Sequence, residues 1–526
     1  MQEIELKFLV PESRLKGLMR QVKVKSSQVT PLAAHYYDTP DQLLAQAGIG
    51  LRIRKEGENW VQTIKAGGDG IAARLEHNAV LDNDQVQQML DNNALVPDLT
   101  LYKDTPVTSA LADFKLKKLQ KTLTRLYVTD VERTTRLLIE ENSDEDDNCI
   151  EVAYDHGEII HGTDDTQRKT IQEIEFELIS GDIGFLFTTA KTWCKRYKLC
   201  LSTVTKAENG GLLVNGQSHS PAVGVDLSQL EVNKDSSLPA FIRAAVHNCL
   251  LQILPNSSAI VAGSIDDEHV LQVSIGLERL QAALKAFDSF SDEINPDWLP
   301  ILKQTANLLG NYYQLTHINT YIESELQVFG APAVDWATDI ENIKITPINT
   351  LQANDFQLTL LELVAFVMSD PSIEPQTDKL AYDKLETILS THYKLCLKTD
   401  KKRDEISDGD FTDDEVESNL SDDDEPDHEL LSHLKDLRYI SEFSAPLLSK
   451  KKAKKQTKRW LKRLIKVQSA LEQHHEDSQY QQYYASKSAT DTNALYGAGW
   501  FAAMLTDDPS YIETRLAKFK DSATFW

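Results

Sequence analysis

The first ten residues contain a run in which charged and apolar side chains alternate. Glu3, Glu5 and Lys7 occupy every second position, with aliphatic or aromatic residues between them. Neighbouring side chains of an extended strand point to opposite faces, so these three charges share one face. Burying that face costs free energy unless the charges meet ions or a charged ligand. A surface strand would instead keep the charges in water. The pattern of the other strands is needed to decide whether the charged face is exposed or buried.

The composition restricts the class of protein. A chain of 526 residues is too long for one hydrophobic core, so two or three domains are expected. The formal net charge of −26 argues against a nucleic-acid or membrane partner. The sequence has no run approaching the roughly 20 apolar residues of a membrane span and no signal-peptide pattern. Its five cysteines lack paired spacing, which is typical of a cytoplasmic protein with reduced thiols.

The predicted secondary structure changes from mainly strand to mainly helix about two fifths of the way along the chain. Residues 1–208 consist mainly of alternating or β-rich runs separated by turn signals, whereas helical periodicity dominates residues 234–526. Residues 209–233 are rich in Gly, Ser and Pro, which predicts a linker. An acidic insert at about 404–429 is predicted to be disordered. A basic run at 450–455 follows this insert, and it is either a solvated helix end or a surface that the insert screens.

The alternation of charge recurs in several later strands. The charged positions are Arg52, Arg54, Lys65, Arg74, Glu76, Arg125, Glu173, Glu175, Glu177 and Lys206. Several strands with charges on one face and aliphatic residues on the other favour a barrel whose interior is charged and whose exterior packs under helices. We therefore predict an α+β protein, with an N-terminal β-barrel followed by an all-α helical-bundle domain.

A barrel interior with both acidic and basic side chains requires ligands that carry both positive and negative charge. Clustered carboxylates are hard oxygen ligands suited to Mg²⁺ or Mn²⁺. Arginine side chains present forked donors that match phosphate oxygens, and lysines add point charge. The sequence thus predicts a site for a polyanion that carries several phosphates, with a divalent metal on one wall.

At these residues the chain resembles the CYTH family, also called triphosphate tunnel metalloenzymes. The matching segments are residues 3–7, 36–41, 50–54, 63–65, 150–155, 173–177 and 205–206. The resemblance covers residues 1–208 and implies an antiparallel eight-stranded tunnel β-barrel that binds triphosphates. The fusion to a helical domain is similar to bacterial CYTH–CHAD inorganic triphosphatases, which hydrolyse tripolyphosphate to pyrophosphate and phosphate.

The resemblance also implies roles for individual residues. The implied metal ligands, for Mg²⁺ or Mn²⁺, are Glu3, Glu5, Glu173, Glu175 and Glu177. The implied substrate-binding residues are Lys7, Arg52, Arg54, Lys65, Arg125, Asp155 and Lys206. Glu3, Glu5, Lys7 and Glu76 are the expected catalytic set. The implied reaction uses a metal-activated water in line with the terminal phosphorus, without a nucleophilic side chain.

The helical half resembles a degenerate CHAD domain, whose family is associated with polyphosphate. Its candidate anion contacts are His269, Arg279, His433, Lys435 and Arg438. Several cations that the family pattern expects near residues 272–277 and 311–314 are missing, so long-chain polyphosphate is only a second candidate partner after tripolyphosphate. Other functions remain open: a class IV adenylate cyclase, another organic-triphosphate hydrolase, or a non-catalytic polyphosphate-binding protein.

Overall fold

The computed structural model describes the chain apart from residues 1, 68–70, 93, 141–146, 408–425 and 449–453. Its contacts divide it into two compact units. The first, here called the barrel unit, comprises Met1–Gly224, Leu250–Val273 and Pro347–Ala365. The second, the helical unit, comprises Val225–Cys249, Ser274–Thr346 and Phe366–Trp526. Each unit is described separately below.

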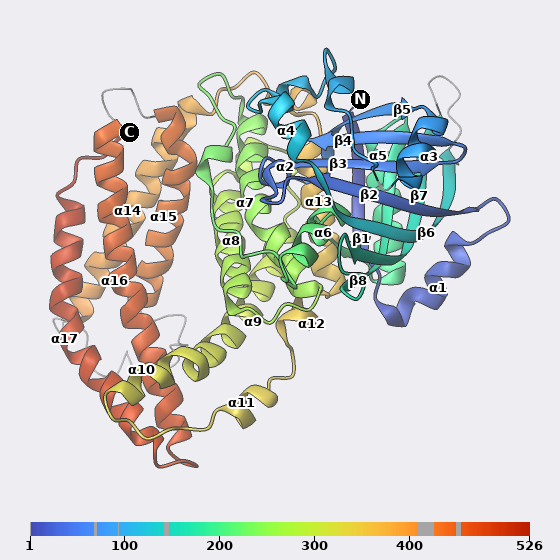
Figure 1. The fold of residues 1–526 in the computed structure, drawn as a ribbon. Coiled ribbons are helices and arrows are strands. Elements are labelled where there is room, and N and C mark those ends of the chain that lie inside the picture. Colours follow the sequence, from blue (N-terminus) through green and yellow to red (C-terminus); the bar gives the residue numbers. More distant parts are fainter. Residues whose placement is uncertain (1, 68–70, 93, 141–146, 408–425, 449–453) are drawn as a thin grey trace. The chain divides into compact units, whose positions relative to one another are not determined.

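The barrel unit is built on a closed antiparallel sheet (Figure 1). Its strands are β1 (Gln2–Leu9), β2 (Gln28–Asp38), β3 (Ile49–Glu56), β4 (Asn59–Ala66), β5 (Ala73–Leu81), β6 (Thr124–Glu140), β7 (Asn148–His161) and β8 (Arg168–Ser180). They follow the order β5-β4-β3-β2-β6-β7-β8-β1, and pairing of β1 with β5 closes the barrel. A two-residue strand, β9 (Cys200–Leu201), pairs with the end of β1. The predicted eight-stranded antiparallel barrel is confirmed.

The register places the charges of β1 and β8 on the same face. Lys7 is the Cα partner of Glu175, and Glu5 is the partner of Glu177. The intervening residues form the outer face, where Phe8 packs edge-on against Phe176 at 5.7 Å between ring centroids. The alternation seen in the sequence therefore separates a charged interior from an apolar exterior.

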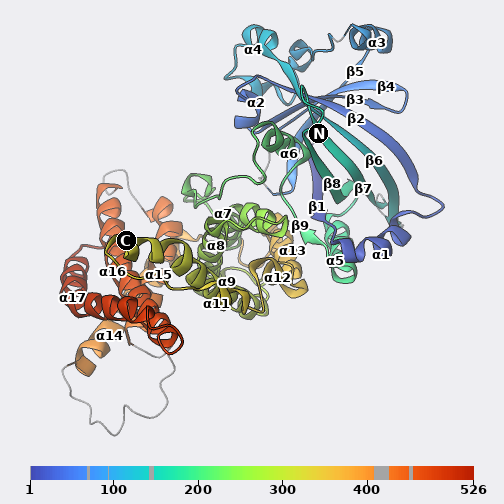
Figure 2. The same ribbon diagram turned by 60° about the horizontal axis from the view of Figure 1, so that its bottom comes forward.

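Helices cover parts of the barrel and interrupt its strands. They are α1 (Glu12–Val22), α2 (Leu43–Gln46), α3 (Asn83–Asp91), the 3-10 turns η1 (Leu99–Tyr102) and η2 (Thr108–Leu111), α4 (Leu116–Thr122), α5 (Ile183–Tyr197) and α6 (Lys206–Val214). Helices α1 and α5 lie side by side against the barrel (Figure 2). Trp193 of α5 packs on Phe176, which buries the outer face of β8. Helix α6 contacts β6, β7 and β8.

Further helices follow in the second half of the chain. They are η3 (Leu227–Gln229), α7 (Leu238–Val261), α8 (Asp267–Ala286), η4 (Asp288–Phe290), α9 (Trp298–His317), the π-turn η5 (Ile318–Ile322), α10 (Glu323–Val328), α11 (Ala337–Glu341), α12 (Pro347–Leu351), α13 (Asn354–Met368), η6 (Pro371–Ile373), α14 (Tyr382–Ser407), α15 (Pro426–Leu448), α16 (Lys454–Lys487) and α17 (Ala494–Lys520). In the helical unit, α14 packs against α15, and α16 packs against both α15 and α17. The predicted helical bundle is thus confirmed.

Two sequence expectations concern segments between these elements. The predicted acidic insert at about 404–429 falls largely on residues 408–425, which lie outside the described residues, while its two ends belong to α14 and α15. The predicted linker at 209–233 begins inside α6, and Val223 exchanges two hydrogen bonds with the side chain of Asn256. Of the helices that the structure describes, none is long and apolar enough to cross a membrane.

Candidate functional site

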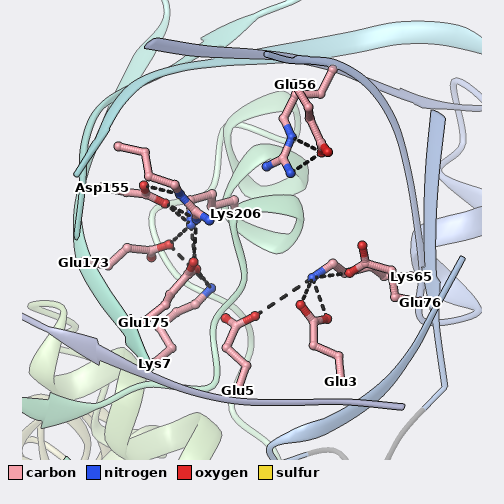
Figure 3. A network of polar contacts seen from close by, with 12 residues as sticks. Glu3, Glu5, Lys7, Glu56, Lys65, Glu76, Asp155, Glu173, Glu175 and Lys206 are labelled. Carbon is pink, nitrogen blue, oxygen red and sulfur yellow. Dashed lines mark hydrogen bonds and ion pairs between the residues drawn. The ribbon is translucent and has the colours of Figure 1, made fainter. Parts of the chain in front are cut away.

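The barrel encloses a cavity of about 790 Å³ whose wall is dominated by charged side chains. Figure 3 shows some of the charged side chains of this region, among them Glu3, Lys65 and Glu175, pointing into the interior from different strands. The charged residues lining the cavity are Glu3, Glu5, Lys7, Asp38, Arg52, Arg54, Glu56, Lys65, Arg74, Glu76, Arg133, Glu151, Glu175, Glu177, Lys206 and Glu208. The cavity therefore collects most of the residues that the sequence predicted for the site.

One group of charges centres on Lys206, the first residue of α6. Its ammonium nitrogen lies 2.7 Å from Oδ2 of Asp155 and 2.6 Å from Oε1 of Glu175, and it also contacts Glu173. Oxygens of these three buried carboxylates lie within 4.8 Å of one another. Asp155 lies on β7 and the two glutamates lie on β8, so α6 delivers a cation to the adjoining strands (Figure 3).

Two further cations complete this first group. Arg133 donates to both oxygens of Asp155, at 2.7 and 2.6 Å, and to Oε2 of Glu175 at 2.6 Å. Lys7 lies 3.3 Å from Glu175 and 3.5 Å from Glu173. Although burial opposes ionisation, Lys206, Arg133 and Lys7 hold the pKa of Glu175 well below its usual range. Three carboxylates and three cations therefore balance each other in this group.

A second group centres on Lys65 of β4. Its Nζ lies 2.7 Å from Glu3, 2.8 Å from Glu76 and 3.9 Å from Glu5. Burial would raise the pKa of Glu76, but Lys65 outweighs it and lowers the pKa to about 2. Lys65 and Arg74, the Cα partner of Glu3, face three carboxylates here, so the second group carries excess negative charge.

Glu177 increases this excess. It is the Cα partner of both Glu5 and Glu151, and paired residues of an antiparallel sheet share a face. Burial, and then the charges of Glu3 and Glu5, raise the pKa of Glu177 to about 7. A carboxyl group held near neutrality by its neighbours indicates a site that lacks a compensating positive charge.

The two groups differ in their fit to a divalent metal. Asp155, Glu173 and Glu175 offer closely spaced oxygens, yet Lys206 already occupies the space between them. The second group presents Glu5 and Glu177 on adjacent strands with too few cations. Hard carboxylate oxygens suit Mg²⁺ or Mn²⁺ in either place, but only the second group needs added positive charge. The five predicted metal ligands are therefore divided between two groups.

Arginines from neighbouring strands supply the cationic part of the wall. Arg52 and Arg54 of β3 and Arg133 of β6 line the cavity. Burial, followed by the charge of Arg52 and Arg133, lowers the pKa of Arg54, although Glu56 opposes this. Arg52 contacts the Tyr36 hydroxyl at 3.5 Å, and its buried Nε has no hydrogen-bond partner among the described residues. Such clustered guanidinium groups favour an anion with many oxygens.

The structure separates Arg125 from this wall. The pairing of β2 with β6 shifts between Tyr36, opposite Tyr127, and Tyr37, opposite Arg125. The irregularity turns Arg125 to the face of Tyr37, a member of a hydrophobic cluster, and Arg125 does not line the cavity. Of the described residues on β6, it is Arg133 that reaches the carboxylates.

Sequence reasoning did not select several residues of the cavity wall, among them Arg133, Glu151 and Tyr36. Arg133 lies in a recognised β-rich run, and Glu151 and Tyr36 both lie in matched segments. Alternation around Asp155 would have assigned Glu151 to the inner face. No comparable sequence signal distinguishes Arg133 from Arg125.

The first two candidate anion contacts of the second half of the chain are buried. In the barrel unit, His269 is 2% exposed, and its ring nitrogens lie 2.9 Å from Oγ of Ser264 and 2.9 Å from the carbonyl oxygen of Ser220. In the helical unit, Arg279 is 1% exposed and donates to Oδ1 of Asn248 at 2.7 Å. Both side chains stabilise their own unit.

The remaining three candidates lie on α15 in the helical unit and have internal partners. His433 is 3.0 Å from Oγ1 of Thr399. Lys435 forms ion pairs with Glu278 at 3.1 Å and Glu472 at 3.3 Å. Arg438 donates to Glu442 at 2.9 Å. Polyphosphate would have to compete with these carboxylates.

Comparison with known proteins agrees with this architecture. Residues 1–210 match the CYTH domain model, and residues 244–483 match the CHAD domain model. The inorganic triphosphatase of Haemophilus influenzae is 31% identical over 223 residues, which cover 41% of this chain and 56% of that protein. The alignment thus spans little more than half of the relative's length.

Two solved structures show a weak similarity to the chain. The CHAD domain from the plant Ricinus communis is 19% identical, with a TM-score of 0.45, and the match covers 58% of this chain and 98% of that one. PptA from Streptomyces chartreusis is 16% identical, with a TM-score of 0.36, and the match covers 55% of this chain and 99% of that one.

Proposed function

The chain carries a CYTH domain followed by a CHAD domain, and we propose that it is a metal-dependent inorganic triphosphatase that hydrolyses tripolyphosphate to pyrophosphate and phosphate. One observation carries this proposal. The same cavity holds a group of carboxylates with excess negative charge, which suits a metal cation, and a cluster of arginine side chains, which suits an anion. The named activity of the Haemophilus influenzae relative supports the same reaction.

The chain's own cations would bind and orient the substrate. Arg52, Arg54 and Arg133 present forked donors to phosphate oxygens, and Lys206 adds a point charge at the start of α6. Phosphoryl transfer depends mainly on positioning and on neutralising charge, so preorganised cations stabilise the departing pyrophosphate. Burial of these groups reduces competition from water and strengthens each contact.

Glu3, Glu5 and Glu177 would hold the divalent cation, Mg²⁺ or Mn²⁺. When bound, the ion would neutralise substrate oxygens and lower the pKa of a coordinated water. Lys65 and Glu76 flank these ligands and keep Glu3 oriented. We assign no side chain as a covalent nucleophile.

A substrate panel tests the reaction. Tripolyphosphate, ATP and thiamine triphosphate are each supplied with Mg²⁺ or Mn²⁺, while released phosphate and cyclic nucleotide are measured. Phosphate from tripolyphosphate alone is the expected result. Cyclic AMP from ATP would identify a class IV adenylate cyclase, and phosphate from the organic substrates would identify an organic-triphosphate hydrolase. No turnover with tight tripolyphosphate binding would indicate a non-catalytic binding protein.

A single substitution tests the metal ligands. Glu5→Gln keeps the size of the side chain but removes a charge from the proposed site, and we expect metal-dependent phosphate release to fall by at least about 100-fold. Glu12→Gln, at an exposed position on α1, is the matched control and should retain wild-type activity. Unchanged turnover by the Glu5 variant, with circular dichroism showing an intact fold, would refute the proposed metal site.

Long-chain polyphosphate is a second candidate ligand, supported by a different surface. Lys454, Lys458, Lys462 and Lys466 recur every fourth residue on α16 and are exposed, so they lie along one side of the helix. Full-length Lys458→Glu/Lys462→Glu should lose salt-sensitive polyphosphate binding. The control Lys117→Glu/Lys118→Glu, at exposed positions of α4, should bind like the wild type. Equal binding by both variants would contradict this role.

A cytoplasmic location also forms part of the proposal. It is supported by the five cysteines, which are all free thiols in the structure. A fractionation experiment with antibodies against the full-length protein would test it, and recovery in an oxidising compartment would contradict it.

A further inference from the structure

The segment that carries Lys206 into the cavity contains little regular structure. It runs from β9 through residues 202–205 to the first turn of α6. Thr205 caps this helix by accepting a hydrogen bond from the amide of Glu208 at 2.9 Å. The position of the Lys206 ammonium therefore depends on what holds residues 201–204 in place.

Three hydrogen bonds from outside this segment hold its backbone. The amide of Ser202 donates to the carbonyl oxygen of Lys7 at 2.9 Å, which links the segment to β1. The amide of Leu201 donates to Oε1 of Gln357 on α13 at 2.8 Å. The amide of Thr203 donates to Oγ of Ser258 on α7 at 3.1 Å. Two of the three acceptors thus belong to helices that follow the barrel in sequence.

Ser258 is a well-defined acceptor. Its side chain is 1% exposed, and its hydroxyl donates to the carbonyl oxygen of Leu254 at 2.7 Å. With the proton committed to the preceding helical turn, a lone pair of Oγ faces the amide of Thr203. The same helix contributes Pro255 to the cavity wall, to which Thr203 also belongs.

We propose that Ser258 is a positioning residue of the triphosphate site, acting through Thr203 to place Lys206. This inference rests on the proposed function. It also gives part of the CHAD match a role in this site, because Ser258 lies within residues 244–483, which match the CHAD domain. The working site therefore extends beyond the CYTH match at residues 1–210 and requires this part of α7.

The effect of losing Ser258 follows from the chain of contacts. Alanine at this position leaves the half-buried Thr203 amide without its side-chain acceptor, so nothing on α7 fixes the direction of that N–H and it turns to another partner. Residues 203–205 carry no other strand pairing. Their displacement moves the start of α6 and shifts the Lys206 ammonium away from its carboxylates and from the substrate.

The neighbouring residue supplies a matched control. Ser257 is also 1% exposed and lies on the same helix, but its Oγ has no hydrogen-bond partner among the described residues. Ser257→Ala and Ser258→Ala remove the same atom from equally buried positions. Only the second removes the contact to Thr203.

The experiment compares both variants in the full-length protein. Ser258→Ala should raise KM for tripolyphosphate about tenfold, from loss of one partly buried hydrogen bond, while Ser257→Ala keeps the wild-type KM. In a Lys206→Met background, Ser258→Ala should raise KM no further, because its effect passes through Lys206. Wild-type KM in Ser258→Ala, or an equal increase in the control, would overturn the proposal.

Binding without turnover separates this inference from the proposed reaction. Isothermal titration of tripolyphosphate in the presence of EDTA should show about tenfold weaker binding to Ser258→Ala than to Ser257→Ala. If the wild-type protein releases no phosphate, the proposed triphosphatase activity fails, and this titration alone judges the role of Ser258. Equal dissociation constants for the two variants would refute that role whatever the activity.

Discussion

The ammonium group of Lys206 lies 2.7 Å from Oδ2 of Asp155, a carboxylate that is fully buried. The two residues come from α6 and β7, more than fifty positions apart. Although burial opposes ionisation, Lys206 and Arg133 keep the pKa of Asp155 below its usual range. The pair therefore anchors α6 to the barrel as well as placing a cation at the cavity.

Removal of Lys206 should destabilise the protein at neutral pH. Lys206→Met leaves three buried carboxylates with two cations, and we expect a loss of about 3 kcal/mol in the free energy of unfolding. With the lysine absent, the folded-state pKa values of these carboxyl groups should rise. The variant should then approach wild-type stability at acid pH and weaken as pH increases, which urea unfolding at several pH values would measure.

A metal titration adds a second readout for this variant. The oxygens of Asp155, Glu173 and Glu175 lie within 4.8 Å of one another, and removal of the lysine leaves room and an uncompensated charge for an ion among them. Mg²⁺ should therefore raise the melting temperature of Lys206→Met more than that of the wild type. Equal shifts in the two proteins would show that this group binds no metal even when it is vacated.

Glu177 should make the stability of the metal-free protein depend on pH. Its pKa is raised to about 7 by burial and by Glu3 and Glu5. A raised folded-state pKa contributes stability that is fully present below the unfolded value and is lost as pH rises through the folded value. Because water screens this partly exposed group, we expect Glu177→Gln to be on the order of 2 kcal/mol more stable than the wild type at pH 8. Near pH 4.5 the two should be equal in urea unfolding with EDTA.

When urea unfolding at pH 8 is repeated with Mg²⁺, the order of stability should reverse, so that the wild type is more stable than Glu177→Gln. The ion replaces the missing positive charge beside ionised Glu177 but gains less from a neutral glutamine. Glu132→Gln, at an exposed position on β6, controls for loss of one acidic charge and should follow the wild type throughout. A stability difference that is the same at both pH values would contradict the account of Glu177.

Strand alternation predicted the faces of β1 and β8 because both strands are regular where they pair. Lys7 opposes Glu175, and Glu5 opposes Glu177, without a register shift between them. The sequence could not predict how the carboxylates divide into two groups. That division depends on where α6 places Lys206, and this position is set by the packing of α6 against the barrel.

Arg125 shows a second limit of sequence reasoning. Alternation along a continuous strand assigns Arg125 and Arg133 to the same face, since they are eight residues apart. The shift in pairing near Tyr36 and Tyr37 reverses the face of Arg125 but leaves that of Arg133 unchanged. A one-residue irregularity moves every side chain beyond it to the other face of the sheet. The residue types around it do not reveal that it is there.

A pair of conservative substitutions checks this assignment. Arg133→Lys keeps the charge but loses the fork that binds Asp155 and Glu175, so KM for tripolyphosphate should rise about tenfold or more. Arg125→Lys makes the same chemical change beside Tyr37 and should leave KM at the wild-type value. A larger effect at Arg125 than at Arg133 would restore the sequence-based assignment.

Gly210 and Tyr127 should be energetically coupled because the ring lies where a Cβ atom would be. A Cβ on Gly210 would be 2.1 Å from Cε2 of Tyr127. That ring also stacks on Tyr36 at 4.8 Å between centroids, and its hydroxyl donates to the carbonyl oxygen of Ala207 at 2.9 Å. Gly210→Ala must therefore displace α6 or the stacked rings, at a cost of about 1–3 kcal/mol.

A double-mutant cycle measures this coupling. Gly210→Ala should cost less in a Tyr127→Leu background, where the smaller side chain leaves room for the added methyl group. Gly211→Ala is the control, because its Cβ would meet only the terminal oxygen of the Gln42 side chain, at 3.2 Å. The control gains helix propensity without a clash and should not lower the urea midpoint. If Gly210→Ala were equally tolerated, or if the cycle showed no coupling, contact with Tyr127 would not be what positions α6 in the barrel.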